Sequence, residues 1–181
     1  MKRLVLAVLA LSFGLFAGLA QAKDSGLPEY VGIFAGRGEA AGAFVALERV
    51  TPVQQTRVRA FGFGGAEAHY SFAGETSPVR FKAGDHIEFV VKTQTQDIDP
   101  ATFVQFYLLK QFHGDRILPL ANVVPFAVRA SDISHDQAVG FDATKYGTNF
   151  FKIVPREPLP PGEYALSSTA GRDGFLFGVD P

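Results

Sequence analysis

Cysteine and tryptophan are absent from this chain of 181 residues, and methionine occurs once. The absence of cysteine excludes disulfide bridges, a thiol nucleophile and thiolate metal ligands. The fold must therefore depend on its packed core. Phenylalanine supplies that core, because all but Phe13 and Phe16 of the 18 phenylalanines follow residue 22, and each buried ring removes about 150 to 250 Å² from water.

The chain also lacks an excess of charge of either sign. It has 17 basic and 18 acidic side chains, a net charge of −1, and the 15 basic and 18 acidic side chains after residue 22 give −3. No basic stripe interleaved with aromatic residues is present to bind phosphates. The composition therefore excludes a nucleic-acid partner.

Residues 1–22 have the three parts of an export signal peptide. Two basic residues begin it, an apolar run follows from Leu4 to Leu19, and an Ala-x-Ala site ends at Ala22. The run is shorter than the roughly 20 residues that a membrane-spanning helix needs, and no cysteine offers a site for lipid attachment. Cleavage after Ala22 is therefore expected to leave a periplasmic or secreted product without a membrane span.

Residues 23–181 are expected to form one domain, because they suffice for one substantial core and not for two. Apolar residues recur with a period of two along this part of the chain, without convincing helical spacing. From Ile87 to Val91 the odd-numbered residues are apolar and are expected to face the core, whereas Glu88 is expected to face water. The pattern predicts an all-β domain.

Short strand candidates separated by turn signals indicate a sandwich or a barrel. The sharpest turn signal is His113-Gly114-Asp115, because Gly and Asp tolerate the positive φ angles of tight hairpins. Ala83-Gly84-Asp85 is a turn-sized link between two further candidates, and residues 64–77 and 130–137 are expected to be loops. The strand candidates span residues 30–35, 43–50, 57–63, 78–82, 86–92, 102–112, 116–120, 123–129, 138–142, 146–154, 163–168 and 174–179.

The carboxy-terminal section indicates which β fold to expect. A proline-rich stretch from Pro158 to Pro161 leads through a glycine into a strand that opens at Tyr164. In Greek-key sandwiches a tyrosine at such a corner donates its hydroxyl to backbone a few residues upstream. We therefore expect a single immunoglobulin-like, Greek-key β-sandwich in which Tyr164 is buried and reaches backbone between Pro155 and Pro160.

This ending resembles that of exported bacterial β-sandwich proteins of uncharacterised function, which finish in a Pro-Gly-Glu-Tyr strand followed by Phe-Gly-Val-Asp. The sharp part of the resemblance covers Pro158 to Asp180, and looser similarity lies at residues 31–34 and 77–80. The resemblance implies a fold. It implies no activity and assigns no catalytic residue.

No catalytic or cofactor motif is present in the sequence. The four histidines lack the spacing of metal sites, a Gly-x-Ser-x-Gly elbow is missing, and residues 36–42 break the dinucleotide-binding pattern at its third glycine. Asp97 and Asp99 have the spacing of a calcium loop without its later Gly and Glu. We therefore predict that the protein is not an enzyme and binds no cofactor and no metal. The alternative that stays open is an enzyme of unrecognised type whose polar clusters lie in long loops.

By exclusion, the sequence favours a non-enzymatic binding or structural module of the cell envelope whose partner is another envelope protein. The alternative is a small closed β-barrel that carries an apolar ligand among its phenylalanines. Carbohydrate binding is a further option, which the lack of tryptophan disfavours and the five tyrosines leave open.

The candidate binding residues lie in loops, because loops on a rigid scaffold carry binding more often than strands do. They are Asp97, Asp99, His113, Asp115 and Arg116. The functional interpretation requires Arg116 to present its guanidinium to an acidic partner, with the two aspartates at residues 97 and 99 close by. The simpler interpretation is a hairpin turn followed by a solvated arginine.

Overall fold

The computed structural model describes residues 26–39, 42–58, 66–123 and 137–181, and the export signal expected at residues 1–22 lies outside them. Most of the strand expected at residues 123–129 and of the loop expected at residues 130–137 also lies outside. Within these ranges the expected all-β fold is confirmed, with 13 strands and one short helix. The elements are β1 (Phe34–Arg37), β2 (Val45–Ala46), β3 (Glu48–Val50), β4 (Val53–Val58), β5 (Ala66–Phe72), β6 (Arg80–Lys82), β7 (Glu88–Lys92), α1 (Pro100–Phe103), β8 (Val104–Phe112), β9 (Asp115–Val123), β10 (Phe141–Tyr146), β11 (Phe150–Pro155), β12 (Gly162–Ser168) and β13 (Gly174–Asp180).

The described strands form two open sheets. One is a five-stranded antiparallel sheet in the order β10-β11-β7-β1-β2. The other has the order β3-β13-β12-β8-β9-β5-β4, and β6 adds to it parallel to β13. Each sheet has end strands, so the described residues do not form the closed barrel of the alternative expectation. The immunoglobulin-like, Greek-key form of the sandwich stays a prediction.

The main core lies between these two sheets and consists largely of phenylalanine. Phe89 on β7 belongs to one sheet, and Phe106 on β8 and Phe177 on β13 belong to the other, yet all three are in one buried cluster. The ring centroids of Phe89 and Phe177 are 4.7 Å apart, and those of Phe89 and Phe106 are 5.7 Å apart. The rings thus fill the space between the sheets by packing on one another.

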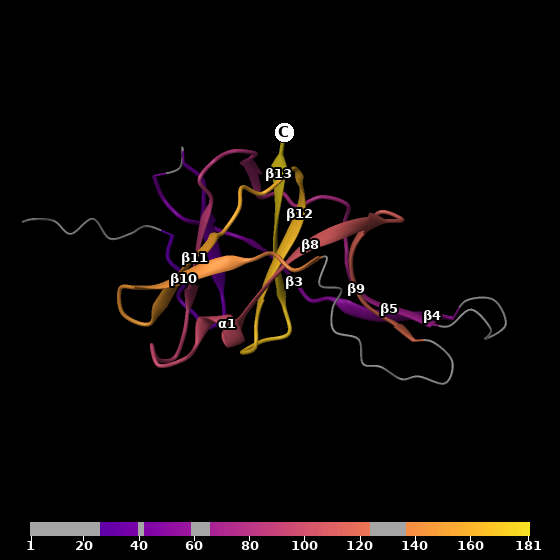
Figure 1. Cartoon of the computed structure of the whole chain (residues 1–181), viewed down its shortest axis with the longest axis horizontal. Coiled ribbons are helices and arrows are strands. Elements are labelled where there is room, and N and C mark those ends of the chain that lie inside the picture. Colours follow the sequence, from indigo (N-terminus) through magenta and orange to yellow (C-terminus); the bar gives the residue numbers. More distant parts are fainter. Residues whose placement is uncertain (1–25, 40–41, 59–65, 124–136) are drawn as a thin grey trace, which may run out of the picture.

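Strand β8 takes part in two different regions of the second sheet. Its residues from Val104 to Leu109 pair with β12, whereas Lys110 to Phe112 pair with β9. Strands β9, β5 and β4, which we call the wing, continue from there and extend away from β10 and β11 (Figure 1). A nine-residue strand thus joins the sandwich to a separate three-stranded ribbon.

The wing packs against one face of the sandwich. Along β12, Tyr164 and Leu166 belong to the main core, whereas Ala165 between them belongs to a second cluster with Phe72 and Leu118 of the wing. Successive residues of a strand point to opposite faces. The wing therefore covers the face of β8, β12 and β13 that points away from the core, which we call the outer face.

Two local predictions about turns and corners are confirmed. His113 and Gly114 form the two-residue loop of the β8–β9 hairpin, with φ angles of 51° and 86°, as a tight primed turn requires. The Tyr164 side chain is 1% exposed, and its hydroxyl donates to the carbonyl oxygen of Pro160 at 2.7 Å. Burial raises the pKa of this phenol to about 12.

One expected loop contains a strand, and one expected turn joins strands that belong to different sheets. The stretch 64–77, expected to be a loop, contains β5, which is held between β4 and β9 although its own residues show little apolar alternation. The link Ala83-Gly84-Asp85 does not close a hairpin, because β6 pairs with β13 in one sheet and β7 belongs to the other. Pairing partners distant in sequence decide both cases.

Glu88 is also placed differently from the expectation. It points away from the core, as the alternation predicts, but it is buried instead of facing water. Arg37 and Lys152 on the neighbouring strands bind its carboxylate, the latter at 3.3 Å. Burial raises the pKa of Glu88, and the hydrogen bonds from Arg37 and Lys152 outweigh it, so the net shift is downward.

Candidate functional site

The loop residues predicted to form one binding site lie at opposite ends of β8. Asp97 and Asp99 are exposed and precede α1, and the Asp99 carboxylate accepts a hydrogen bond from the backbone N–H of Ala101 at 2.9 Å. His113 follows the other end of β8. Because a nine-residue strand spans about 30 Å, the expectation that these residues lie near one another is wrong.

The expectation that Arg116 is exposed is also wrong. Its side chain is 0% exposed, and its guanidinium binds both carboxylate oxygens of Glu48 at 2.7 and 3.1 Å. Nε and Nη2 donate to the carbonyl oxygens of Gly74 and Ala73. Arginine is seldom fully buried without such partners, and these lie 42 to 68 positions away in sequence. The Arg116 side chain therefore stabilises the fold and is not exposed to a binding partner.

The two remaining candidates of the hairpin differ in exposure. Asp115 is half-buried and accepts a hydrogen bond from the Ser71 hydroxyl at 2.7 Å. His113 is exposed, and its ring centroid lies 4.2 Å from that of Phe112. His113 is thus a residue of a hairpin turn, as the simpler interpretation holds. Asp115 and Arg116 bind other residues of the fold.

Arg116 belongs to a group of four charged residues, which we call the charged junction: Glu48, Arg80, Arg116 and Glu163. Glu163 is 5% exposed, binds Arg80 directly and lies 3.6 Å from Arg116. Its second oxygen accepts the backbone N–H of Ser77 at 2.9 Å. The junction ties β3, β6, β9 and β12 together at one end of the outer face. In this group the buried arginine and glutamate side chains pair with one another, and charged groups are buried at low cost only when they are paired in this way.

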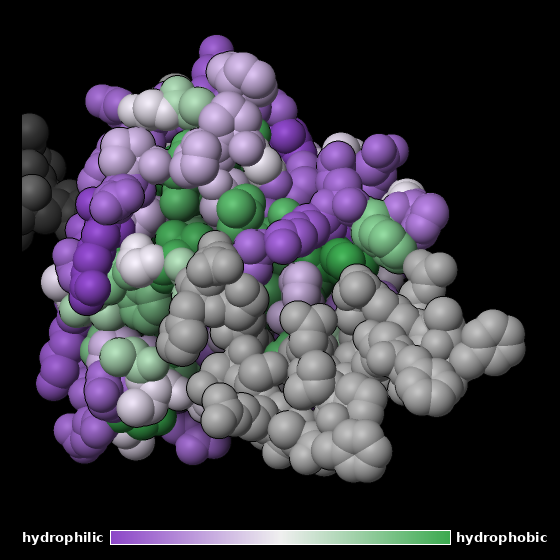
Figure 2. Space-filling model, turned by 45° about the vertical axis from the view of Figure 1, so that its right-hand side comes forward, coloured by the Kyte–Doolittle hydropathy of each residue, from purple (hydrophilic) through white to green (hydrophobic). Residues whose placement is uncertain are grey.

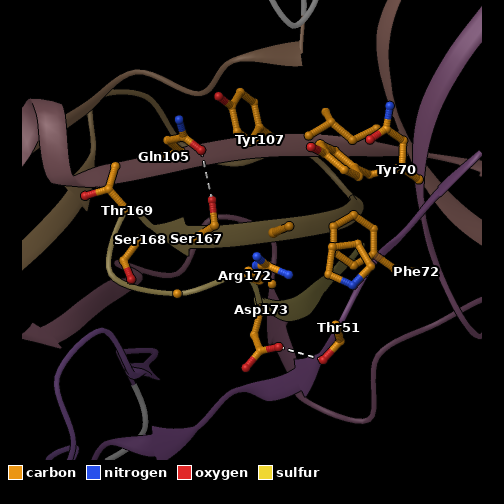
Figure 3. A pocket seen from close by; sticks show the side chains of 16 residues that line it. Thr51, Tyr70, Phe72, Gln105, Tyr107, Ser167, Ser168, Thr169, Arg172 and Asp173 are labelled. Carbon is orange, nitrogen blue, oxygen red and sulfur yellow. Dashed lines mark hydrogen bonds between the residues drawn. The ribbon is translucent and has the colours of Figure 1, made fainter.

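A cleft of about 570 Å³ lies on the same outer face, between the wing and the sandwich. Its floor comes from β8 and β12, one wall comes from the wing, and the opposite side comes from the loop between β12 and β13 (Figure 3). It is lined by Thr51, Pro52, Gln54, Tyr70, Phe72, Gln105, Tyr107, Leu118, Ala165, Ser167, Ser168, Thr169, Gly171, Arg172, Asp173 and Gly174.

Polar groups on the cleft floor are arranged side by side. The Ser167 hydroxyl donates to the side-chain oxygen of Gln105 at 3.2 Å, which leaves the Gln105 amide N–H groups directed elsewhere. Tyr107 stands next to Gln105 along the strand and is half-buried, and burial raises the pKa of its phenol. The floor thus combines an aromatic ring with an amide and a hydroxyl (Figure 3).

Two charged residues from the β12–β13 loop border the cleft. Asp173 accepts hydrogen bonds from Thr51 and Arg49, both at 2.6 Å, and these lower the pKa of its carboxyl group. Arg172 is exposed and forms no hydrogen bond or ion pair with the residues that the structure describes. Arg172 is one of the residues that line the cleft (Figure 3). The acidic group is therefore neutralised, whereas the basic group is available.

Two of the strands that line the cleft, β12 and β5, have neighbouring strands on both sides. β12 lies between β8 and β13, and β5 lies between β4 and β9, so both strands are hydrogen-bonded on both sides. A molecule in the cleft would contact side chains of these strands.

Seen from the wing side, apolar surface occurs in patches separated by polar side chains (Figure 2).

The chemistry of the lining residues suits binding. Ser167 donates to a neutral amide, which does not act as a general base, and none of the described residues that line the cleft is a histidine. Within the described ranges, no group of three or more His, Asp or Glu side chains is placed to hold a metal ion. The described part of the chain contains no helix of the length and apolarity needed to cross a membrane.

The sequence singled out none of the cleft residues, because they come from five separate segments between Thr51 and Gly174. The one signal that pointed to them was the presence of five tyrosines, two of which, Tyr70 and Tyr107, line the cleft. Comparison of the chain with protein-family models, with curated proteins and with solved structures finds no match. Residue roles therefore follow from this structure's geometry.

Proposed function

We propose that this protein is an exported, non-enzymatic binding module of the cell envelope and that the cleft is its recognition site. The cleft itself is the observation that supports the proposal. Its volume of about 570 Å³ lies within the range of roughly 300 to 1,000 Å³ common to ligand sites. The side chains of its floor stand on the paired strands β8 and β12, which hold them in place.

The architecture of the cleft favours recognition of a polar partner. Its floor offers hydrogen-bonding groups beside an aromatic ring, and Arg172 adds a positive charge that no acidic residue in the described ranges pairs with. An apolar-ligand carrier is less well supported, since Phe89, Phe106 and Phe177 pack on one another between the sheets. The partner in this proposal is a component of the envelope that presents a polar group to the cleft.

The export part of the proposal rests on the sequence of residues 1–22, with their basic start, apolar run and Ala-x-Ala site. Intact-mass measurement of the protein from its producing cell tests it. A chain that begins at Lys23 supports export. A membrane-bound product that retains Met1 to Ala22 contradicts it.

Cleft filling tests the binding part. Ser167→Phe would place a ring on the cleft floor without entering the main core, because Ser167 is half-buried on the outer face. Thr144→Phe is the matched control, since Thr144 is exposed on β10 of the other sheet. Both substitutions are expected to change the free energy of unfolding by no more than about 0.5 kcal/mol.

Capture of envelope material on the immobilised protein is the readout. The proposal predicts that wild type and Thr144→Phe retain the same component and that Ser167→Phe does not. Equal retention by Ser167→Phe would show that the cleft is not the recognition site.

A further inference from the structure

We infer that the cleft binds a saccharide that carries a carboxylate, such as a uronic acid, with Arg172 as the carboxylate partner; this inference rests on the proposed function of the cleft. Three features carry it: the charge balance of the cleft, its aromatic and hydrogen-bonding side chains, and the hydrogen-bonded neighbours on both sides of β12 and β5.

The charge balance selects an acidic group. The carboxylate of Asp173 is occupied by Thr51 and Arg49 at 2.6 Å each. Arg172, its neighbour in sequence, has no hydrogen-bond or ion-pair partner among the described residues and is one of the residues that line the cleft (Figure 3). The planar fork of arginine matches the two oxygens of a carboxylate. The cleft therefore carries one uncompensated positive charge of a shape that suits this group.

The neutral side chains suit a ring with hydroxyl groups. Tyr107 and Tyr70, both half-buried, line the cleft, Tyr107 from the floor and Tyr70 from the wing. Aromatic rings present an apolar face to the C–H face of a sugar, while Gln105 and Ser167 supply donors and acceptors for its hydroxyls. The lining thus has groups that suit both the apolar C–H face and the polar hydroxyl groups of a pyranose ring.

The sheet topology disfavours an extended peptide as the occupant. A peptide carries a backbone N–H and C=O at each residue and usually satisfies them at an exposed strand edge. The floor strand β12 and the wall strand β5 each have hydrogen-bonded neighbours on both sides. A saccharide has no such backbone, and its hydroxyls can be satisfied by the side chains that the cleft offers.

Calorimetric titration with matched disaccharides tests the inference. The probes are digalacturonic acid with galactobiose, and cellobiouronic acid with cellobiose, so that each pair compares an acidic saccharide with a neutral one. At least one acidic member is expected to bind about tenfold more tightly than its neutral counterpart at low salt. No heat from either acidic disaccharide up to about 10 mM would overturn the inference.

Variants separate the two contacts. Arg172→Gln is expected to reduce the affinity for the acidic member to that of the neutral one, with Arg156→Gln, an exposed arginine paired with Asp142, as the control. Tyr107→Ala is expected to weaken both members, with the exposed Tyr30→Ala as the control. An acid preference that survives Arg172→Gln would contradict the assignment.

The result is independent of the capture experiment. Should Ser167→Phe abolish envelope capture while neither acidic disaccharide binds, the proposed function stands and the saccharide assignment is wrong. Preferential binding of an acidic tripeptide used as a third probe would overturn the assignment in the same way. Equal capture by wild type and Ser167→Phe would contradict the proposed function itself.

Discussion

Arg116 and Glu48 form a bidentate ion pair in which the arginine side chain is 0% exposed and the glutamate side chain is 21% exposed. The pair joins β9 of the wing to β3 at the edge of the sandwich. The charge of Glu163, 3.6 Å from Arg116, is shared with Arg80. The orientation of the wing, and with it one wall of the cleft, thus depends on a buried charge cluster.

Arg116→Met is expected to lower the free energy of unfolding by about 3 kcal/mol or more, because it leaves two carboxylates without their shared cation. Urea unfolding at pH 7 measures this. Arg156→Met is the control, since its pair with Asp142 is exposed and is expected to contribute about 1 kcal/mol at most. Equal losses for the two variants would show that burial of Arg116 does not decide its contribution.

Tyr164→Phe is expected to cost about 1 kcal/mol at neutral pH, the usual net contribution of one buried hydrogen bond, here to the carbonyl oxygen of Pro160. Thermal and urea unfolding measure the loss. Tyr30→Phe at an exposed ring is the control and is expected to have no effect. An unchanged stability for Tyr164→Phe would mean that the corner hydrogen bond adds nothing to the fold.

Alkaline pH gives a second test of the same tyrosine. Burial raises the pKa of Tyr164 from 10.0 to about 12, so the folded state retains the proton that the unfolded state loses. The resulting stabilisation is fully present below pH 10 and is lost as the pH rises through about 12. The wild type is therefore expected to lose stability relative to Tyr164→Phe across this window. A constant difference between the two proteins would contradict the raised pKa.

Acid pH tests Glu88, whose pKa lies below 4.5 because the hydrogen bonds from Arg37 and Lys152 outweigh the effect of burial. A lowered pKa in the folded state gives stabilisation that is present above pH 4.5 and is lost as the pH falls through the folded value. Glu88→Gln should therefore be less stable than the wild type at pH 7, with a difference that shrinks at lower pH. The exposed Glu157→Gln serves as the control. A difference that does not change with pH would rule out this ion pair as its source.

Gly178→Ala is expected to destabilise the protein by about 1 to 3 kcal/mol, as overpacking does. A Cβ atom on Gly178 would overlap the guanidinium of Arg80 and lie 2.7 Å from Oε1 of Glu163. Gly140→Ala is the control, because its Cβ would have only an ordinary contact with Arg156 at 3.6 Å. Chemical unfolding compares the two variants. A neutral Gly178→Ala would indicate that Arg80 moves aside without loss.

The local features of the fold could be predicted from the sequence. The His113-Gly114 turn follows from backbone conformations that these residues tolerate, and the Tyr164 corner follows from a proline-rich approach to a tyrosine four residues beyond its acceptor. The phenylalanine core follows from alternation along single strands. Each of these is determined by interactions between residues close in sequence or by a period of two.

The charged junction and the cleft could not be predicted in this way. Arg116 carries the features of an exposed hairpin residue, and only the approach of Glu48, 68 positions earlier in the chain, makes its burial favourable. The strand β5 shows little alternation and exists because β4 and β9 flank it.

The sequence by itself thus determined most of the strands, the tight turn and the aromatic core, since periodicity and turn chemistry act over a few residues. Only the tertiary structure decided which charges are buried and which side chains share the cleft. The physical reason is that the wing folds over the outer face through contacts between distant segments, as between Arg116 and Glu48, which lie 68 positions apart. Neither periodicity nor local turn chemistry encodes which distant segments meet.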